Sequence, residues 1–474
     1  MSSSVNPLSS LSTSLGSSSS GSSATSGTGL GQGINVQQFV QYAVANQQAT
    51  ITSLQNDQSS LGSQNSEIST IQSDLTNLDN AANALSDPLG VFNSQTTTSS
   101  NSGILTATGS GSATAGTHTI SITNLATTSS YYTDAVATSS TQLATGDTIN
   151  ISVGGTPVTS VTTNSSNNTL AGLAAAINSS QTAVQASVIN DATGARLALV
   201  SNTSGAPGSI SITGNLHLTN SSNTAINFHQ AAQGLNATLS VDGVPISSAS
   251  NTVTGVISGV TLNLTAPTVT NGVNNPVTLT VAPDTSQITS AINNLVSTYN
   301  TVTNEINGQF QVSSSGVASG VLENDDTLRQ VQSMLLSAIS YSVSGNSGIV
   351  NLASIGVNMN DDGTLTVDNS TLNSALANNF SAVQNLMQGA TSGFAQNLDS
   401  VIQTINAPGS GLLFLDAQAN TSTSQGDEQQ ITDLQASLTV QEQQLTALYS
   451  QVNTTLQELP LLENQMTQQL AGIA

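Results

Sequence analysis

Apolar residues recur every seven positions near the C-terminal end of the chain. The series has no polar member and runs Ile431, Leu438, Leu445, Val452, Leu459, Met466 and Ile473. A second series, three residues further on, is apolar at every other place. A seven-residue repeat of this length winds an apolar seam along one long helix, and the seam requires a partner helix. A single amphipathic helix on a globular core is the alternative, but core helices usually stop well short of this length.

Pro460 lies inside this pattern. Proline has no backbone N–H, and its ring collides with the carbonyl of the preceding turn, at a cost of about 3 kcal/mol in a helix interior. We therefore expect the C-terminal helix to kink or break at Pro460.

A second long helix is predicted near the start of the chain, between residues 33 and 88. Asn35 followed by Gln38 resembles a capping box, and Pro88 marks the end of the pattern. The seven-residue spacing returns here, so we expect this helix to be the partner of the C-terminal one. The predicted seam of the resulting coiled-coil leg comprises Leu54, Leu61, Ile68, Leu75, Ile431, Leu438, Leu445, Val452, Leu459 and Met466.

From about Val91 to residue 284 the apolar residues alternate with Ser and Thr, and Gly, Asn and Pro stand between the short runs. This pattern predicts antiparallel strands in sandwich-like modules, interrupted by one helix at about 170–178. Residues 151–158 read like residues 239–246, each as a strand, a two-residue turn and a return strand. Two related modules and a reused hairpin explain this similarity about equally well.

Helical spacing returns between residues 285 and 420, with a hairpin at Asp362 and Gly363. The expected fold class is therefore α+β multidomain, with the terminal helices paired as a coiled-coil leg around an inserted antiparallel β-sandwich-like head. The expected segments are a disordered export segment (1–32), leg helices (33–88), a head of two modules (89–284), a helical and hairpin leg domain (285–420) and a coiled-coil helix (421–474).

Charge is the unusual part of the composition. Among 474 residues there are 25 Asp and Glu but only two Lys and Arg, giving a net charge of −23, and Cys is absent. The lack of a basic patch argues against binding to nucleic acid or an anionic membrane surface, and no apolar run is long enough for insertion into a membrane. Because Ser, Thr, Asn and Gln solvate the surface instead, we expect stability to change little between about pH 7 and pH 2. The low content of Lys and Arg is then either an adaptation to acid or the result of compositional drift.

The first 28 residues are rich in Ser and Gly, lack the features of a cleavable secretory signal, and are predicted to be disordered.

No catalytic, cofactor or metal site is predicted. His118, His217 and His229 lie on predicted strands without acidic or His neighbours at ligand spacing, and His118 is expected to be a core or interface residue. The stretch from Asn358 to Gly363 approximates a calcium loop. However, its twelfth position is Asn369, where a bidentate Glu is needed, so a tight turn is favoured. We do not expect an enzyme.

Three stretches of the chain, in the same order along the sequence, resemble the hook-associated, filament-capping family of the bacterial flagellum. Residues 29–36 and the Gln-rich helix up to Pro88 look like its N-terminal domain. Residues 145–149, 170–178 and 195–201 are similar to the β insertion module of flagellin and hook-associated proteins, here at about 143–215. Residues 352–357, 362–368 and 383–387 resemble the C-terminal domain of the family.

The resemblance implies a cap at the distal tip of the flagellum that promotes folding and insertion of exported flagellin and prevents its loss. The implied partners are further copies in a small ring, flagellin, hook-filament junction proteins and an export chaperone, and the implied location is extracellular. The near-absence of Lys and Arg and the presence of Pro460 depart from the family pattern. The alternative is an exported Ser/Thr-rich adhesin with a coiled-coil stalk, which need not pair its own two termini.

Overall fold

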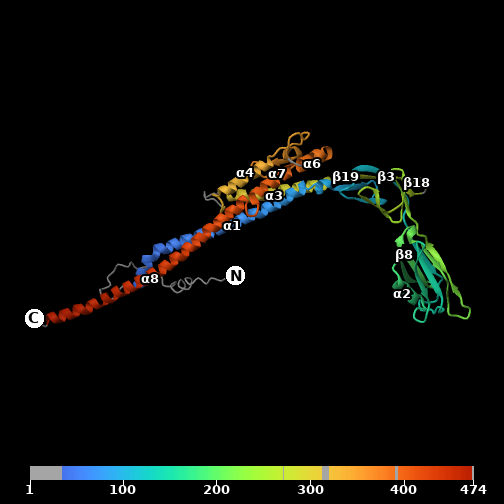
Figure 1. The fold of residues 1–474 in the computed structure, drawn as a ribbon, viewed down its shortest axis with the longest axis horizontal. Helices are drawn as coiled ribbons and strands as arrows, with labels where there is room; N and C mark the ends of the chain where they lie inside the picture. The colour runs from blue at the N-terminus through green and yellow to red at the C-terminus, as the bar shows by residue number, and fades with distance from the viewer. Residues whose placement is uncertain (1–34, 271, 312–319, 390–392, 472–474) are drawn as a thin grey trace. The chain divides into compact units, whose positions relative to one another are not determined.

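The computed structural model describes residues 35–270, 272–311, 320–389 and 393–471 (Figure 1). The expectations for the export segment 1–32 and for Ile473 lie outside these residues. The chain divides into two compact units, each built from segments that are distant in sequence. The terminal unit falls within residues 1–72, 308–327 and 407–474, and the central unit within 73–307 and 328–406. Whether the five expected segments are separate domains stays a prediction.

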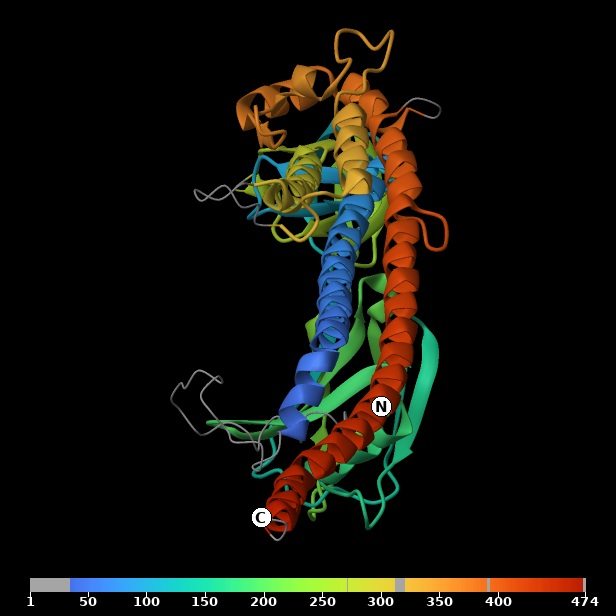
Figure 2. The same ribbon diagram turned by 90° about the vertical axis from the view of Figure 1, so that its left-hand side faces the viewer.

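The terminal unit is built on two long helices, α1 (Val36–Ser86) and α8 (Leu412–Ala471). Both views show them side by side (Figures 1 and 2). The predicted cap of α1 is confirmed, because the Gln38 amide donates to Oδ1 of Asn35 at 3.2 Å. The helix ends at Ser86, before Pro88, and its residues beyond 72 belong to the central unit.

The helix was expected to kink or break at Pro460, and a break is wrong, because α8 continues through it to Ala471. A kink at Pro460 stays a prediction. Proline removes one backbone hydrogen bond from a helix of 60 residues, and the remaining bonds on both sides persist. The residues around Pro460 face solvent, so water can hydrate the carbonyl that loses its partner.

The central unit contains a β sandwich made of two antiparallel sheets. Their strand orders are β1-β19-β3-β13-β14 and β15-β16-β2. The strands are β1 (Gln95–Ser99), β2 (Leu105–Gly109), β3 (Gly116–Asn124), β13 (Ala237–Val241), β14 (Val244–Ser248), β15 (Thr252–Ile257), β16 (Val260–Leu264) and β19 (Val277–Pro283). Alternate residues such as Ile120, Leu262 and Leu279 are fully buried in one core between the two sheets. The predicted period of two is therefore confirmed for this region.

A second β module is inserted between β3 and β13 and has a core of its own. Its sheets have the orders β12-β4-β8-β7 and β6-β5-β9. Its elements are β4 (Thr128–Thr133), β5 (Thr148–Val153), β6 (Thr156–Thr162), α2 (Leu170–Ser180), β7 (Val184–Asp191), β8 (Gly194–Ser204), β9 (Ile210–Thr213) and β12 (Phe228–Ala232), with the short pair β10 (Leu216–His217) and β11 (Ala225–Ile226). Thr169 caps α2, whose Leu170, Leu173 and Ile177 enter the core.

The two hairpins that read alike in sequence are β5–β6 and β13–β14. Gly154 and Gly155 have φ of 59° and 82°, and Asp242 and Gly243 have φ of 51° and 84°. Positive φ at both central residues is the signature of the two-residue type I′ turn, so the same turn chemistry is used twice.

The helices of the central unit follow the sandwich. They are α3 (Thr285–Gln309), α4 (Asp326–Ile339), α5 (Asn369–Asn378), α6 (Phe380–Gln388) and α7 (Phe394–Asn406), of which α3 and α4 also reach into the terminal unit. Short elements complete the chain: η1 (Val91–Asn93), η2 (Ala206–Gly208), η3 (Leu352–Ile355), β17 (Val269–Thr270), β18 (Val273–Asn274), β20 (Val357–Met359) and β21 (Leu365–Val367). The β20–β21 hairpin confirms the predicted tight turn. The carboxylate of Asp362 accepts from the amide and hydroxyl of Thr364 at 2.9 and 2.6 Å, and Gly363 has φ of 82°.

Candidate assembly site on the terminal helices

The helices α1 and α8 pack antiparallel through a small apolar cluster. Val44 and Ile51 of α1 meet Ile431 and Leu438 of α8, and all four side chains are buried. Leu54, Leu434 and Leu445 pack against this cluster and are partly buried. Further along, the rings of Phe39 and Tyr449 lie 5.8 Å apart. The two helices thus make the contact expected of a coiled-coil pair.

Polar contacts continue the pairing on the other side of the cluster. The Nε2 of Gln58 donates to the carbonyl of Ser424 at 3.0 Å and to Oε2 of Glu428 at 3.1 Å. The Nδ2 of Asn65 donates to the hydroxyl of Thr421 at 3.2 Å. Because these groups meet only at one alignment of the helices, they fix the register.

The predicted seam residues fall into two groups. Ile431 and Leu438 are buried against α1, and Ile68 and Leu75 are fully buried, whereas Leu54, Leu61 and Leu445 are partly buried. Val452, Leu459 and Met466, further along α8, are exposed by 41%, 44% and 62%. Sequence reasoning omitted Val44 and Ile51 from the seam. The signal was present, since the two residues are seven positions apart, but Gln58 and Asn65 continue that series and make it look polar.

The uncovered part of α8 carries a stripe of large apolar side chains, which we call the α8 stripe. All of its members are exposed by 41–67%: Leu448, Val452, Leu459, Leu462, Met466 and Leu470. Figure 1 shows α8 extending past the first turns of α1 toward the C-terminus. Exposed apolar residues that recur along one helix are typical of an interaction surface.

Four basic side chains of the central unit, three His and Arg196, lie beside aspartates. His118 Nδ1, His217 Nδ1 and His229 Nε2 lie 2.8, 3.2 and 2.7 Å from the carboxylates of Asp242, Asp147 and Asp134, and Arg196 Nε lies 2.8 Å from that of Asp191. Three of these pairings help to hold an aspartate pKa below its usual value. For Asp242 the His118 hydrogen bond is the main cause, for Asp134 the Asn227 amide comes before His229, and for Asp191 the Thr193 hydroxyl comes before Arg196.

The three His–Asp pairs join residues that are 70 to 124 positions apart, each within one β module, so they hold distant segments of that module together. His118 lies on the same side of β3 as Ile120 and is partly buried, with its polar edge turned to Asp242. No group of three or more His, Asp or Glu that could hold a metal occurs among the residues that the structure describes. No helix in the same part of the chain is long and apolar enough to cross a membrane.

Paired terminal helices with an uncovered apolar stripe, joined to inserted β modules, define a protein that works by assembly. Residues 32–129 match the sequence model of the flagellar hook-associated protein 2 N-terminus, and residues 234–460 match that of its C-terminus. Residues 148–203 match the flagellin hook IN motif.

Known proteins agree with these matches. The chain is 33% identical over 379 residues to the B-type flagellar hook-associated protein 2 of Pseudomonas aeruginosa, covering 75% of this chain and 77% of the relative. It is 31% identical over 404 residues to the flagellar hook-associated protein 2 of Escherichia coli K12, covering 79% and 84%. The crystal structure of the flagellar cap protein FliD from Escherichia coli superposes with a TM-score of 0.55 at 29% identity, covering 75% of this chain and 99% of that one.

The chain therefore belongs to the flagellar hook-associated protein 2 family. The family resemblance and the fold class expected from the sequence are confirmed, and the adhesin alternative is not favoured.

Proposed function

We propose that this chain is the cap at the distal tip of a bacterial flagellar filament. There it promotes the folding and insertion of exported flagellin and prevents flagellin from being lost. The observation that carries the proposal is the α8 stripe, which the described residues leave exposed although the same helix is paired with α1 nearby. A structural role in assembly accounts for these features, and the proposal includes no catalytic activity.

The size of the stripe suits a contact that forms and releases. Burying one Leu, Val or Met side chain is worth about 1.5–3 kcal/mol, so the half-exposed members of the stripe give a gross gain on the order of 10 kcal/mol or less. Association alone costs an estimated 4–15 kcal/mol or more. The stripe of one subunit therefore binds weakly by itself, and firm attachment requires several subunits acting together.

The chemistry of the stripe selects its partners. An apolar seam flanked by Gln, Asn, Ser and Thr fits another amphipathic helix, so we assign flagellin and further copies of this chain, arranged in a small ring, as the partners. Hook-filament junction proteins and an export chaperone are further proposed partners. The working location is then the flagellum tip, outside the cell. The seam from Leu54 to Met466 is proposed as the assembly surface.

Deletion of the gene tests this function. A strain without the cap should release unpolymerised flagellin into the medium and swim poorly, and the wild-type gene should restore both. Complementation with Leu459→Asp and Met466→Asp together should fail, whereas exchanging exposed Thr467 for Asp in the same helix should succeed. Full-length filaments in the deletion strain, with loss of attachment to surfaces only, would instead support the adhesin.

A further inference from the structure

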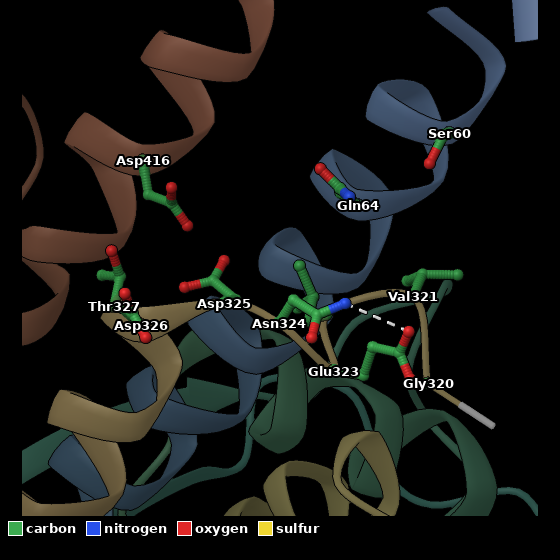
Figure 3. A pocket seen from close by; sticks show the side chains of 11 residues that line it. Ser60, Gln64, Gly320, Val321, Glu323, Asn324, Asp325, Asp326, Thr327 and Asp416 are labelled. Atoms are coloured by element: carbon green, nitrogen blue, oxygen red, sulfur yellow. Dashed lines mark hydrogen bonds between the residues drawn. The ribbon is translucent and has the colours of Figure 1, made fainter. Parts of the chain in front are cut away.

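The charged side chains of the terminal unit are all acidic. Its sequence contains no Lys, Arg or His, because both arginines and all three histidines of the chain belong to the central unit. The pocket that α8 shares with α1 and the segment before α4 is an example (Figure 3). Its charged lining residues are Glu323, Asp325, Asp326 and Asp416. A second copy of this unit therefore offers only neutral or acidic side chains to α8.

Two carboxylates flank the α8 stripe, one on each side. Glu458 immediately precedes Leu459, and Glu463 immediately follows Leu462. In a seven-residue repeat with Leu459 and Leu462 in its seam, these are the positions that border the partner helix and set the choice of partner by charge. Both glutamates are exposed, and the helix is continuous around them. A helix that covers the stripe thus brings its own flanking residues to both carboxylates.

The row of α8 that contains Glu463 meets a hydrogen-bond donor where α1 covers it. Glu428 and Glu463 are 35 positions apart, which is five repeats of seven, and a seven-residue repeat keeps such residues in one row of a supercoiled helix. In the α1–α8 pair, Nε2 of Gln58 donates to Oε2 of Glu428 at 3.1 Å. A carboxylate in this row therefore receives a donor from the opposite helix, and we expect the same for Glu463.

A second copy of α8 does not supply this donor. In a parallel pair, a residue that precedes the seam lies opposite the residue five places further on in the other helix. Glu458 of each copy would then face Glu463 of the other. An antiparallel pair also brings only neutral or acidic residues to these glutamates, because α8 contains no basic residue. Like charges across a seam select against such a pairing, so copies of this chain in a ring meet elsewhere.

We propose that the α8 stripe selects an amphipathic helix of a different protein, one that carries Lys or Arg on both sides of its own apolar seam. A cation beside Glu463 takes the place that the Gln58 amide has beside Glu428, and hydrogen bonds between charged groups are stronger than those from a neutral amide. Apolar contact supplies the attraction, and the two carboxylates determine the partner. This inference rests on the proposed function, in which the stripe binds during assembly.

Two synthetic helices test the choice of partner with the full-length protein. Each is a fluorescent peptide of four seven-residue repeats with Leu in the seam, and its flanking positions are all Lys or all Glu, so that neither peptide pairs with itself. Fluorescence anisotropy should show that the Lys peptide binds at least about fivefold more tightly than the Glu peptide. Glu458→Lys together with Glu463→Lys should lower this ratio by roughly tenfold.

The matched control is Asp361→Lys together with Asp433→Lys. It changes the net charge equally at exposed positions away from the stripe, so the ratio should stay as in the wild type. An equal fall of the ratio in both double variants, or no fall in either, would overturn the inference. So would a dimer of the wild-type protein, seen by light scattering, that Leu459→Asp with Met466→Asp dissociates, because a second copy would then cover the stripe.

Complementation of the deletion strain separates this inference from the proposed function. Glu458→Lys with Glu463→Lys should release flagellin into the medium, whereas the Asp361→Lys and Asp433→Lys control should retain it. Normal capping with the two Lys at 458 and 463, together with loss of capping in Leu459→Asp with Met466→Asp, would overturn the charge selection and leave the proposed function standing. Normal capping with both of these variants would contradict the proposed function itself.

Discussion

Gln58 of α1 reaches across to Glu428 of α8, with 3.1 Å between the amide nitrogen and the carboxylate oxygen. Gln58 stands seven residues after Ile51 and seven before Asn65, which makes its own contact with Thr421. The pairing of the terminal helices thus changes from apolar to polar contacts along one row of α1. A polar residue in such a row costs stability and defines the alignment of the two helices.

Replacing Gln58 by Leu should therefore strengthen the pairing and loosen its specificity. We expect a rise in stability of about 1 kcal/mol, together with self-association or a mixture of helix alignments. Thermal unfolding and light scattering after size-exclusion chromatography measure the two effects. Gln55→Leu, at an exposed position of the same helix, is the control and should not change the alignment. A variant that stays monomeric with a single alignment would show that Gln58 does not set the register.

Leu445→Asp should abolish capping while the β modules remain folded. The side chain packs against the cluster of Val44, Ile51, Ile431 and Leu438, where a carboxylate would be partly buried without a partner. We expect the loss of about 3 kcal/mol or more of helix pairing. Flagellin in the medium reports the loss of capping, and circular dichroism reports the fold.

Gln443→Asp places the same charge at an exposed position two residues away and should be tolerated. Normal filament growth with Leu445→Asp would count against the seam.

The ends of the isolated protein should be cleaved before its middle. The α8 stripe is exposed, and two helices alone bury little surface, so this part opens more readily than the β cores. Limited proteolysis should leave a resistant core near residues 90–420, as read by mass spectrometry of the fragments. Equal protection of the first and last 40 residues or so in dilute monomer would exclude a leg that becomes ordered on assembly.

Stability should change little between pH 7 and pH 2.5. Several aspartates, among them Asp134, Asp242, Asp284 and Asp362, have a lowered pKa, and hydrogen bonds from Ser370 and Thr371 lower that of Asp368 to about 2. A lowered pKa gives stability that is present above the ordinary value near 3.8 and is lost as the pH falls toward the folded value. These groups are mostly exposed, so each loss is small.

The melting temperature should accordingly stay nearly constant between pH 7 and about pH 4, where these aspartates are still ionised. It should fall only modestly below that range, because few positive charges remain to repel one another. Thermal unfolding at pH 7, 4.5 and 2.5 checks the profile. A melting temperature lower by more than about 20 °C at pH 2.5 than at pH 7 would contradict it.

Patterns that repeat along the chain predicted most of the fold. The seven-residue spacing predicted the helices that meet at Ile431 and Leu438, and the period of two predicted the strands around Ile120 and Leu279. Contacts between distant residues could not be predicted in this way. His118 and Asp242 are 124 positions apart, and nothing in either local sequence selects the other.

Pro460 shows a different limit of sequence reasoning. Its intrinsic penalty is real, but the surrounding turns of α8 outweigh it. The register between α1 and α8 could not be predicted from the sequence either. Gln58 and Asn65 interrupt the apolar row to which Val44 and Ile51 belong, so the sequence favoured the neighbouring row through Leu54 and Leu61.

The amide and hydroxyl contacts between α1 and α8 affect how the pairing of these helices depends on the salt concentration of the medium. Attraction between surface charges is screened over about 8 Å at physiological ionic strength and about 3 Å in 1 M salt, so a leg held by Lys–Glu pairs weakens in brine. Asn65 and Thr421 are neutral, and Gln58 donates from a neutral amide, so dissolved ions screen these contacts little. The helices should pair equally well in fresh water and in concentrated salt, which unfolding at both extremes of ionic strength would measure.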